Sequence, residues 1–460
     1  MNNNTTADLG SGSIGKLLFR LALPAITAQI VNVLYNMVDR MYIGHIPEVG
    51  ATALTGMGVC LPLIVVISAF GALSGMGGAP RAAIKMGQQD NEEAERILGN
   101  CTTGTVLFGI ILTVVFRLFS DDLLMVFGAS ENTFPYASAY MHIYSCGTLF
   151  VLISLGLNSF ISTQGFATVS MLSTLIGAVS NIILDPILIF GLNMGVEGAA
   201  LATIISQAFS AIWILHFLSG RKTKLKIRKK NLHIHLKTYL PCMALGLSPF
   251  IMQSTESLIS ICFNTSLLKY GGDVAVGSMT ILSSVMQFSM LPLQGLTQGA
   301  QPIISYNYGA KNADRIRDTF FLLLKSCLLY SSLLWAIAIF TPQVFVAIFT
   351  SDPALTAYAK WSMRIYMSMS LIFGAQIACQ QTFLALGNAK TSLFLAILRK
   401  IILLIPLIFI LPHCFADKVM AVFLAEPVAD TLAVSTTVTM FAIQFRQVLK
   451  ELRTSREAST

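Results

Sequence analysis

The sequence predicts an all-α, polytopic membrane protein with about twelve transmembrane helices in two six-helix lobes around a central cavity. Of its 460 residues, 55% are hydrophobic and 11% are charged, whereas soluble domains carry about 25% charged residues. Apolar runs of about 20 residues, long enough to cross a bilayer, recur along the whole chain. Motifs of the first half also return in the second half at a fixed spacing. The chain is therefore expected to span the membrane many times and to contain an internal duplication.

The apolar runs follow one another with short polar connections, and no polar stretch is long enough for a separate soluble domain. One strongly basic segment divides the runs into two equal sets. We expect an N-terminal lobe over residues 1–219, a basic loop over 220–238, a C-terminal lobe over 239–446 and a tail over 447–460. In chain order, the predicted spans are 17–42, 51–78, 97–119, 136–161, 168–192, 196–219, 239–268, 274–301, 318–349, 356–385, 391–414 and 418–446.

The distribution of lysine and arginine predicts the orientation in the membrane. The 220–238 loop contains many basic residues and no acidic residue, and the loops at 81–96 and 311–317 are basic as well. Basic loops stay in the cytoplasm, so both termini and the 220–238 loop are expected there, with the protein in the cell membrane. The net charge of +8 is thus a topology signal, and no nucleic-acid partner is expected.

An internal repeat relates the two halves. The motif GMGGAPRAAIKMG, which ends at Gly87, matches GLTQGAQPIISYNYG, which ends at Gly309, at an offset of 222 positions. Six spans per half is an even number, so both copies have the same orientation and their pseudo-symmetry axis runs along the membrane normal. Two such bundles enclose a cavity between them, which favours a transporter that works by alternating access. Further pairs at this offset are Gly77 with Gly299, Pro80 with Pro302, and Gly165 with Gly387.

Asp185 and Pro186 lie together inside one long apolar run. A carboxylate in hydrocarbon costs several kcal/mol by most estimates, so such a residue usually serves a function. The proline cannot donate a backbone hydrogen bond, which leaves an acceptor near Ile182 free and bends the helix. The pair therefore predicts part of an ion or substrate pathway; the alternative is a buried aspartate satisfied by one neighbouring helix.

Further polar residues are expected at a similar depth, toward the outer ends of their spans. Asp39, Tyr140 and Thr203 belong to three other predicted spans, while Asn181 lies one helical turn from Asp185 and on the same face. Together these side chains would form a cation-coupling pocket. Two acids in a poorly hydrated site could bind and release H⁺, and the oxygens of Asp39, Asn181, Asp185 and Thr203 could instead coordinate Na⁺. Both ions stay open, as do an Asp39–Arg40 surface pair, a packing role for Thr203 and an interfacial role for Tyr140.

In the second half, Glu256 falls near the middle of a predicted span, with Gln253 one turn earlier. We expect Gln253, Glu256, Gln380 and Arg399 to line a substrate cavity in which the glutamate attracts small organic cations. The alternative for Glu256 is a structural ion pair with Arg399 or Lys400.

Other functional classes find less support in the sequence. The eight cysteines are scattered singly, without the spacing of a metal centre or a disulfide framework. A membrane-embedded enzyme would need catalytic acids or histidines near one interface, and none is evident, so we expect no enzyme and no cofactor besides H⁺ or Na⁺ as the coupling ion. A flippase for lipid-linked precursors would favour an arginine-rich cavity, for which Arg399 and Lys400 are thin support. The protein is expected to act as a monomer in the lipid bilayer.

The chain resembles the MATE (multidrug and toxic compound extrusion) family, and within it the bacterial MepA-like branch. The motifs that carry this resemblance are LDPILIFG at 184–191, GAALATIISQ at 198–207, YGGDVAVGSMTI at 270–281 and QGAQPIISYNYGAKN at 298–312. The resemblance implies twelve helices in two lobes, and export of amphiphilic organic cations driven by inward flow of H⁺ or Na⁺.

Within the family, the DinF-like group couples cations through an N-terminal pocket of two aspartates, an asparagine and a threonine. These positions match Asp39, Asn181, Asp185 and Thr203, and a nearby tyrosine matches Tyr140. The acidic pair that other branches carry in the second lobe is matched only by Glu256, because Gln380 and Arg399 stand where carboxylates would be needed.

Overall fold

The computed structural model describes residues 8–350 and 352–457, and every regular element in these ranges is a helix. The first half contains α1 (Ile14–Gly44), α2 (Gly50–Gly87), α3 (Asn91–Val126), α4 (Phe134–Cys146), α5 (Thr148–Thr163), α6 (Ala167–Pro186), the π-helix η2 (Ile187–Gly191) and α7 (Gly195–Ser219), followed by the 3-10 turn η3 (Lys229–Asn231). The second half contains α8 (Leu236–Gly309), α9 (Ala313–Phe340), α10 (Gln343–Val346), α11 (Pro353–Tyr366), α12 (Ser370–Ala385), α13 (Ala389–Ile397), the π-helix η4 (Leu398–Leu404), α14 (Ile405–Cys414) and α15 (Lys418–Glu457).

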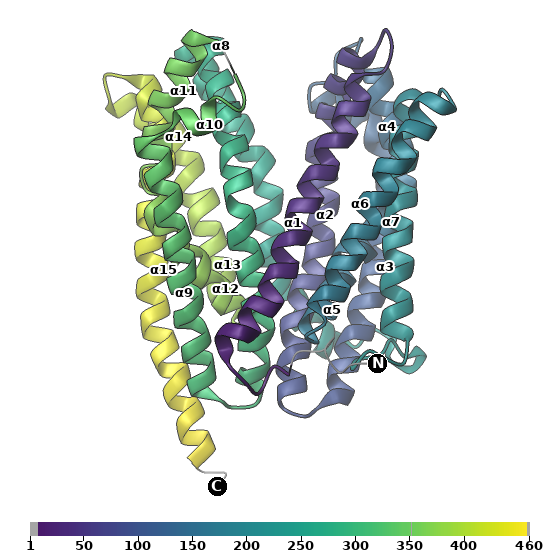
Figure 1. Cartoon of the computed structure of the whole chain (residues 1–460), viewed down its shortest axis with the longest axis vertical. Helices are drawn as coiled ribbons and strands as arrows, with labels where there is room; N and C mark the ends of the chain where they lie inside the picture. Colours follow the sequence, from purple (N-terminus) through teal and green to yellow (C-terminus); the bar gives the residue numbers. More distant parts are fainter. Residues whose placement is uncertain (1–7, 351, 458–460) are drawn as a thin grey trace.

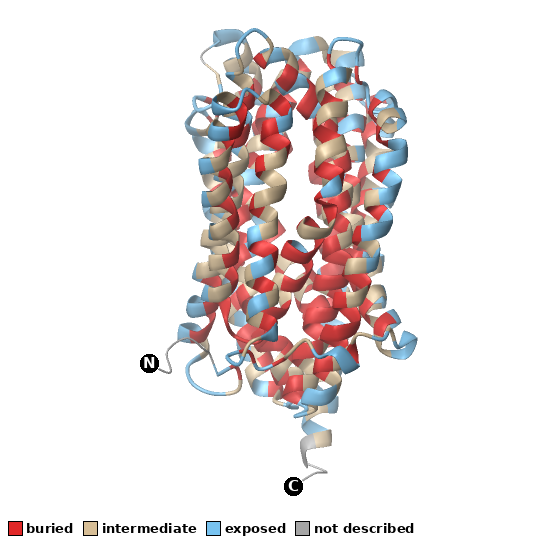
Figure 2. Cartoon of the chain, turned by 90° about the vertical axis from the view of Figure 1, so that its right-hand side faces the viewer, coloured by how far each residue is buried: buried red, intermediate tan, exposed pale blue. Residues whose placement is uncertain are grey.

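The helices stand side by side in two groups, with α1–α7 on one side and α8–α15 on the other (Figure 1). Each group has a hydrophobic core of its own. One core is built from residues between Ile43 and Ala200, and another from residues between Ile259 and Ala429. Buried residues lie along the inner sides of the helices, and exposed residues lie on the outer sides and in the loops at both ends (Figure 2). The division into two six-helix lobes at the predicted boundaries stays a prediction.

The described residues include nine helices that are long and apolar enough to cross a membrane, or ten if the bent pair α4 and α5 counts as one span. These two helices meet at Gly147 with a bend of 58°. Helix α8 has 74 residues, far more than the roughly 20 that cross a bilayer, and its backbone breaks at Gly272, where φ is 67°. The expected span at 356–385 is divided into α11 and α12, which are too short to cross singly. The structure thus contains many membrane-crossing helices, and the count of twelve stays a prediction.

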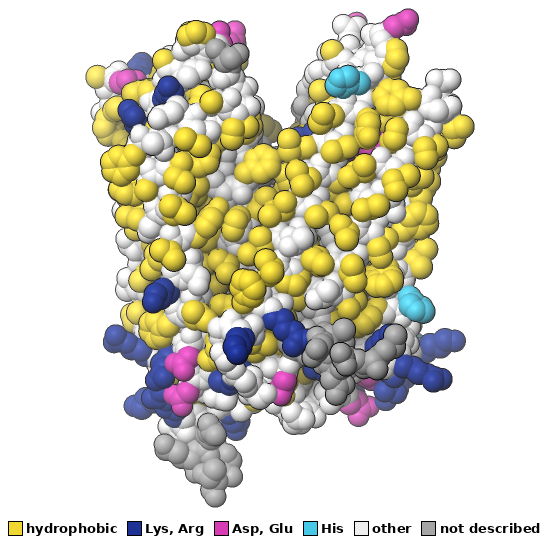
Figure 3. Space-filling model, viewed as in Figure 1, with side chains coloured by type: hydrophobic (Ala, Val, Ile, Leu, Met, Phe, Trp, Pro, Cys, Tyr) yellow, Lys and Arg dark blue, Asp and Glu magenta, His cyan; other side chains and the backbone are white. Residues whose placement is uncertain are grey.

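One end of the molecule is strongly basic. Lysine and arginine side chains gather around its lower end in Figure 3, where the chain termini also lie in Figure 1. We call this the basic end; it includes the loop between α7 and α8 and the loop between α8 and α9. Helix α15 continues through Glu457, so residues 447–457 of the predicted tail extend this helix at the basic end.

The two halves meet near the basic end and diverge toward the opposite end, where a notch separates them on the surface (Figure 3). Glycines allow α2 and α8 to touch backbone to backbone at this contact. A Cβ atom at Gly87 would overlap the carbonyl oxygen of Tyr306, and one at Gly309 would overlap that of Ile84. These contacts are related by the repeat, because Ile84 and Tyr306 are also 222 positions apart. The structure is therefore closed between the halves at the basic end.

The first helix of each half crosses to the other half at the basic end. On α1, Leu17, Leu21 and Ala22 are buried in a hydrophobic cluster with residues of the second half. The start of α8 packs against α2 in return, because Gly246 lies on the backbone of Leu73. The closed contact thus joins each half to the first helix of the other half.

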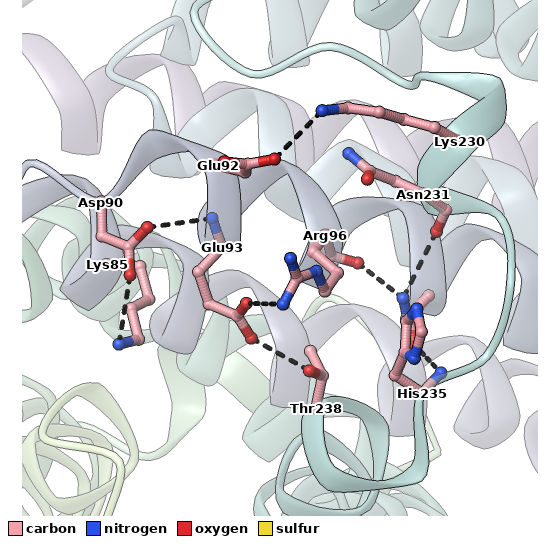
Figure 4. A network of polar contacts seen from close by, with 10 residues as sticks. Lys85, Asp90, Glu92, Glu93, Arg96, Lys230, Asn231, His235 and Thr238 are labelled. Atoms are coloured by element: carbon pink, nitrogen blue, oxygen red, sulfur yellow. Dashed lines mark hydrogen bonds and ion pairs between the residues drawn. The ribbon is translucent and has the colours of Figure 1, made fainter.

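The loop that connects the halves is fastened to α3 by a network of polar contacts (Figure 4). The side-chain amide of Asn100 donates to the carbonyl oxygen of Asn231, and its Oδ1 accepts from the backbone N–H of His235. Thr238 donates to Glu93, and Lys230 pairs with Glu92. This loop is therefore held to the first half, although it leads into the first helix of the second.

Candidate functional site

Asp185 stands where α6 gives way to a π-helix. Helix α6 ends at Pro186, and residues 187–191 continue as η2. Pro186 has no N–H to donate, and the wider π turn lets the chain continue past the interrupted hydrogen-bond pattern. Asp185 is fully buried, and its Oδ1 accepts a hydrogen bond of 3.2 Å from the amide of Asn181, one turn earlier. The predicted shared face of Asn181 and Asp185 is therefore present.

Asp39 reaches the same region from α1, five residues before that helix ends at Gly44. Its side chain is 3% exposed, whereas Arg40 points outward and forms no ion pair with it among the described residues. The carboxylates of Asp39 and Asp185 are close enough to interact electrostatically. Helices α1 and α6 thus bring the two predicted acids together inside the first half.

Thr203 and Tyr140 complete the group of residues that the sequence predicts. Thr203 on α7 donates to the carbonyl oxygen of Ala199 at 3.0 Å and is half-buried. Tyr140 on α4 is 2% exposed and stacks on Tyr144. Its hydroxyl lies within reach of both Thr203 and the charge of Asp39. Tyr140 is therefore inside the helix bundle rather than at its outer surface.

Sequence reasoning missed Tyr35, which lies near both carboxylates and against Gln207 of α7. It precedes Asp39 by four residues on α1, so the two side chains share a face of that helix. This i−4 spacing is the same signal that linked Asn181 to Asp185, and it would have identified Tyr35 as well.

Three oxygen atoms of this pocket have no hydrogen-bond donor among the described residues. They are Oδ1 of Asp39, Oδ1 of Asn181 and Oδ2 of Asp185. No group of three or more histidine, cysteine, aspartate or glutamate side chains suited to a metal ion occurs in the described ranges. A site with two carboxylates, amide and hydroxyl oxygens matches the ligands that hard monovalent cations take, and a carboxylate can also hold a proton.

In the second half, Arg399 is buried in a cluster of charges. Its Nε donates to Asp430 at 2.8 Å and its NH2 group donates to Glu426 at 3.0 Å, both on α15. The guanidinium also lies over the ring of Phe373, 4.6 Å from its centre. All three charged side chains are at most 8% exposed. The structure therefore places Arg399 between two acids inside the second half.

Replacing Arg399 by methionine is expected to destabilise the protein by about 3–5 kcal/mol, because Glu426 and Asp430 would remain buried without their counter-charge. Thermal unfolding in detergent, followed by loss of the monomer peak, measures the change. The triple variant Arg399→Met/Glu426→Gln/Asp430→Asn should recover most of the loss. A single variant as stable as the wild type would show that the acids do not need the arginine.

Lys400, the next residue, holds Glu256. Its Nζ lies 2.6 Å from Oε1 of Glu256, and the lysine is 8% exposed while the glutamate is 58% exposed. Glu256 thus forms an ion pair with Lys400, as one of the two sequence interpretations has it, and more than half of its side chain stays accessible.

The two glutamines predicted for a substrate cavity lie near this pair. Gln380 accepts from Gln376 at 3.2 Å and contacts the sulfur of Met252 with its amide, while Gln253 is half-buried on α8. Met252 precedes Glu256 by one turn, so Gln380 and Glu256 lie beside the same segment of α8. Arg399 is separated from this surface by its burial among the acids of α15.

Comparison with known proteins finds matches over nearly the whole chain. The model of the MatE family matches residues 24–187 and again residues 249–410, once in each half. The multidrug export protein MepA of Staphylococcus haemolyticus (strain JCSC1435) is 27% identical over 423 residues, which cover 92% of both chains. That of Staphylococcus aureus (strain MRSA252) is 26% identical over 408 residues, covering 87% of this chain and 88% of the relative.

Solved structures share the fold. A crystal structure of a MATE protein in its bent conformation superposes with a TM-score of 0.90 at 20% identity, covering 96% of this chain and 98% of that chain. An outward-facing multidrug resistance MATE family transporter of the MOP superfamily gives 0.89 at 21% identity, covering 97% and 99%. The predicted family and the all-α membrane fold are thus confirmed, and a transporter family agrees with the expectation that the chain is not an enzyme. The chain belongs to the MatE family.

Proposed function

We propose that this protein is an antiporter of the cell membrane that exports amphiphilic organic cations in exchange for H⁺ or Na⁺. The observation that carries the coupling is the pocket of Asp39, Asn181, Asp185 and Thr203, with Tyr140 against it. It contains two buried carboxylates and no ion pair to either of them among the described residues. Export of drugs is supported by similarity to the multidrug export protein MepA of two staphylococci.

The proposed cycle couples this pocket to the contact at the basic end. We take the basic end as cytoplasmic, since basic loops remain on that side, and residues 1–219 and 239–446 as the two lobes. Binding of the coupling cation would favour one arrangement of the lobes over the other. This requires that the cation bind more tightly to one arrangement than to the other. In the arrangement described above, the halves touch at the basic end and the notch opens at the opposite end; under the proposed orientation, this form would open to the outside.

Glu256 is proposed to attract the organic cation. Its exposed carboxylate is bound on one side by Lys400, and the cluster of Glu256, Lys400, Arg399, Glu426 and Asp430 contains three acids and two bases. The formal charge of this group is therefore −1, which favours a cationic ligand over an anionic one. A flippase for diphosphate-linked precursors is less well supported, because both basic residues are already paired with acids.

Replacing Glu256 by glutamine is expected to lower transport of organic cations about 10- to 100-fold, the effect of losing one charge-assisted contact. Transport of a neutral amphiphile should change far less. Comparing the two substrates in proteoliposomes measures the difference. In the double variant Glu256→Gln/Lys400→Met, which leaves no unpaired lysine, cation transport should stay low; full recovery would show that Glu256 serves only to neutralise Lys400.

Driven transport in proteoliposomes tests the proposed function. A fluorescent organic cation is presented to sealed vesicles with an imposed pH gradient, an imposed Na⁺ gradient, or neither. We expect accumulation with one gradient only, which would identify the coupling ion. Equal movement under all three conditions would contradict antiport.

A further inference from the structure

Helix α11 carries an open groove at the end of the molecule opposite the basic end. The groove encloses about 620 Å³ and is lined along one face of the helix by two basic residues and a tryptophan among smaller side chains. Figure 3 shows basic side chains at the upper left, where Figure 1 draws α10 and α11. The lining residues are Pro353, Thr356, Ala357, Lys360, Trp361, Arg364 and Ile365.

The two basic residues of this groove are one helical turn apart on the same face. Neither Lys360 nor Arg364 forms an ion pair with an acid among the described residues. Arg364 uses its Nε to donate to the carbonyl oxygen of Ile339, which fixes the guanidinium against the end of α9. The groove thus contains two positive charges without a counter-charge among the side chains that the structure describes.

The internal repeat shows what the corresponding place in the first half contains. The segment YASAYMHIY, residues 136–144, matches YAKWSMRIY, residues 358–366, at the offset of 222. In the first half, Asp121 accepts a hydrogen bond from Ser138 at 2.6 Å and lies 3.2 Å from Nε2 of His142. In the second half, Ser138 and His142 become Lys360 and Arg364.

The acid of this triad is also replaced, because Gln343 stands where the first half has Asp121. The first copy is therefore complete within the protein, with an anion held between two donors. The second copy has two stronger donors and no anion. An anion from outside the chain would occupy the position that the Asp121 carboxylate takes in the first half.

The groove lies near the depth of lipid headgroups. Helix α9 starts at the basic end and is 28 residues long, or about 40 Å, which exceeds the roughly 30 Å of the hydrocarbon core. Arg364 lies level with the far end of this helix, because it donates to Ile339, one residue before α9 ends. Trp361 is 38% exposed, and tryptophan favours the membrane–water interface. Helix α9 and the segment around α10, which both contact α11, expose Phe340, Val344 and Ile348.

We propose that Lys360 and Arg364 bind the phosphate of an anionic phospholipid in the leaflet opposite the basic end. Its acyl chains would lie along the exposed apolar side chains of α9 and α10. The site is separate from the transport pocket and does not depend on the proposed exchange reaction. The site pairs two basic side chains with an apolar surface. A phospholipid offers both a phosphodiester charge and acyl chains to this site, whereas a free anion offers only the charge.

Quenching of Trp361 by brominated lipid tests this site. The fluorescence of the variant Trp213→Phe/Trp335→Phe, in which Trp361 is the remaining tryptophan, is titrated in detergent with dibromo-phosphatidylglycerol. A parallel titration uses dibromo-phosphatidylcholine, which has the same bromines but no net charge. We expect phosphatidylglycerol to quench at a lower mole fraction than phosphatidylcholine.

The charge variant Lys360→Gln/Arg364→Gln should raise the phosphatidylglycerol concentration at half-quenching about 10- to 30-fold, given the attraction of two basic residues to an anionic headgroup. The matched control is Lys269→Gln/Lys418→Gln, which removes two basic residues that lie over Tyr270 instead; it should titrate like the parent.

Three results would overturn the proposal. One is equal quenching by the two lipids, which would mean that the groove does not select charge. Another is a charge variant that elutes as the same monomer as its parent and is half-quenched at the same phosphatidylglycerol concentration. The third is displacement of phosphatidylglycerol by millimolar inorganic phosphate, which would identify a site for free anions.

Discussion

Replacing Asp185 by asparagine is expected to reduce gradient-driven export to about the rate of protein-free vesicles. The substitution keeps the size of the side chain and one acceptor for the amide of Asn181, but removes the charge that a coupling cation would balance. Without that charge, the cation has little differential affinity for the two arrangements of the lobes and cannot drive their exchange. Uptake of a fluorescent organic cation by proteoliposomes under the active gradient measures the effect.

The control for this variant is Asp122→Asn. Asp122 belongs to the same half and the same end of the molecule, but its side chain is exposed. It should transport at the wild-type rate. The coupling role of the pocket would be contradicted if the Asp185→Asn protein is folded and correctly reconstituted and still shows gradient-driven export at the wild-type rate.

Adding one methyl group at the closed contact is expected to have a comparably large effect. In Gly87→Ala and in Gly309→Ala, the new Cβ would overlap a backbone carbonyl oxygen of the other half, which no rotation of a side chain can relieve. Overpacking of this kind costs about 1–3 kcal/mol and would shift the balance between closed and open lobes about 5- to 150-fold. Each variant should therefore favour the form that is open at the basic end and transport slowly.

Labelling of Cys242 measures this opening. Cys242 is fully buried at the start of α8, beside Gly77 of the other half. We expect a water-soluble maleimide to modify it faster in Gly87→Ala and Gly309→Ala than in the wild type, as followed by peptide mass spectrometry. Gly58→Ala, on the same helix α2 but with open space around the added atom, should change neither labelling nor transport. Unchanged labelling together with normal transport in Gly87→Ala would contradict the role of this contact.

Local sequence patterns predicted the helical membrane fold because the length of an apolar run is a local property. They predicted one helix break and missed another. The break of α8 at Gly272 falls in the predicted connection between the spans 239–268 and 274–301, where Lys269 and Asp273 interrupt the apolar run. The predicted span at 136–161, in contrast, is divided at Gly147 without any charged residue that would signal a loop.

The pocket of the first half was predictable because each of its acidic residues is unusual for its place in the sequence. A carboxylate in an apolar run is rare enough to identify Asp39 and Asp185, and helical spacing adds Asn181. Tyr35 has the same helical spacing to Asp39, but a tyrosine in a membrane span is common, and its proximity to Asp185 depends on how α1 packs against α6.

The partners of Arg399 could not be assigned from the sequence. Glu426 and Asp430 follow it by 27 and 31 residues on another helix, and the sequence says nothing of the rotation of α15 about its axis. An arginine in an apolar run fits a ligand site as well as a buried ion pair. Only the packed arrangement shows that both of its donor groups meet acids.

The exchange of substrate for cation is tested most directly by following the coupling ion while the substrate moves down its own gradient. Proteoliposomes loaded with an organic cation are diluted into medium without it, and a dye in the lumen reports H⁺ or Na⁺ while substrate leaves. The proposed antiport predicts that the coupling ion enters the lumen as substrate leaves, and that Asp185→Asn abolishes this entry. Substrate leaving through the wild-type protein without entry of either ion would contradict cation-coupled antiport.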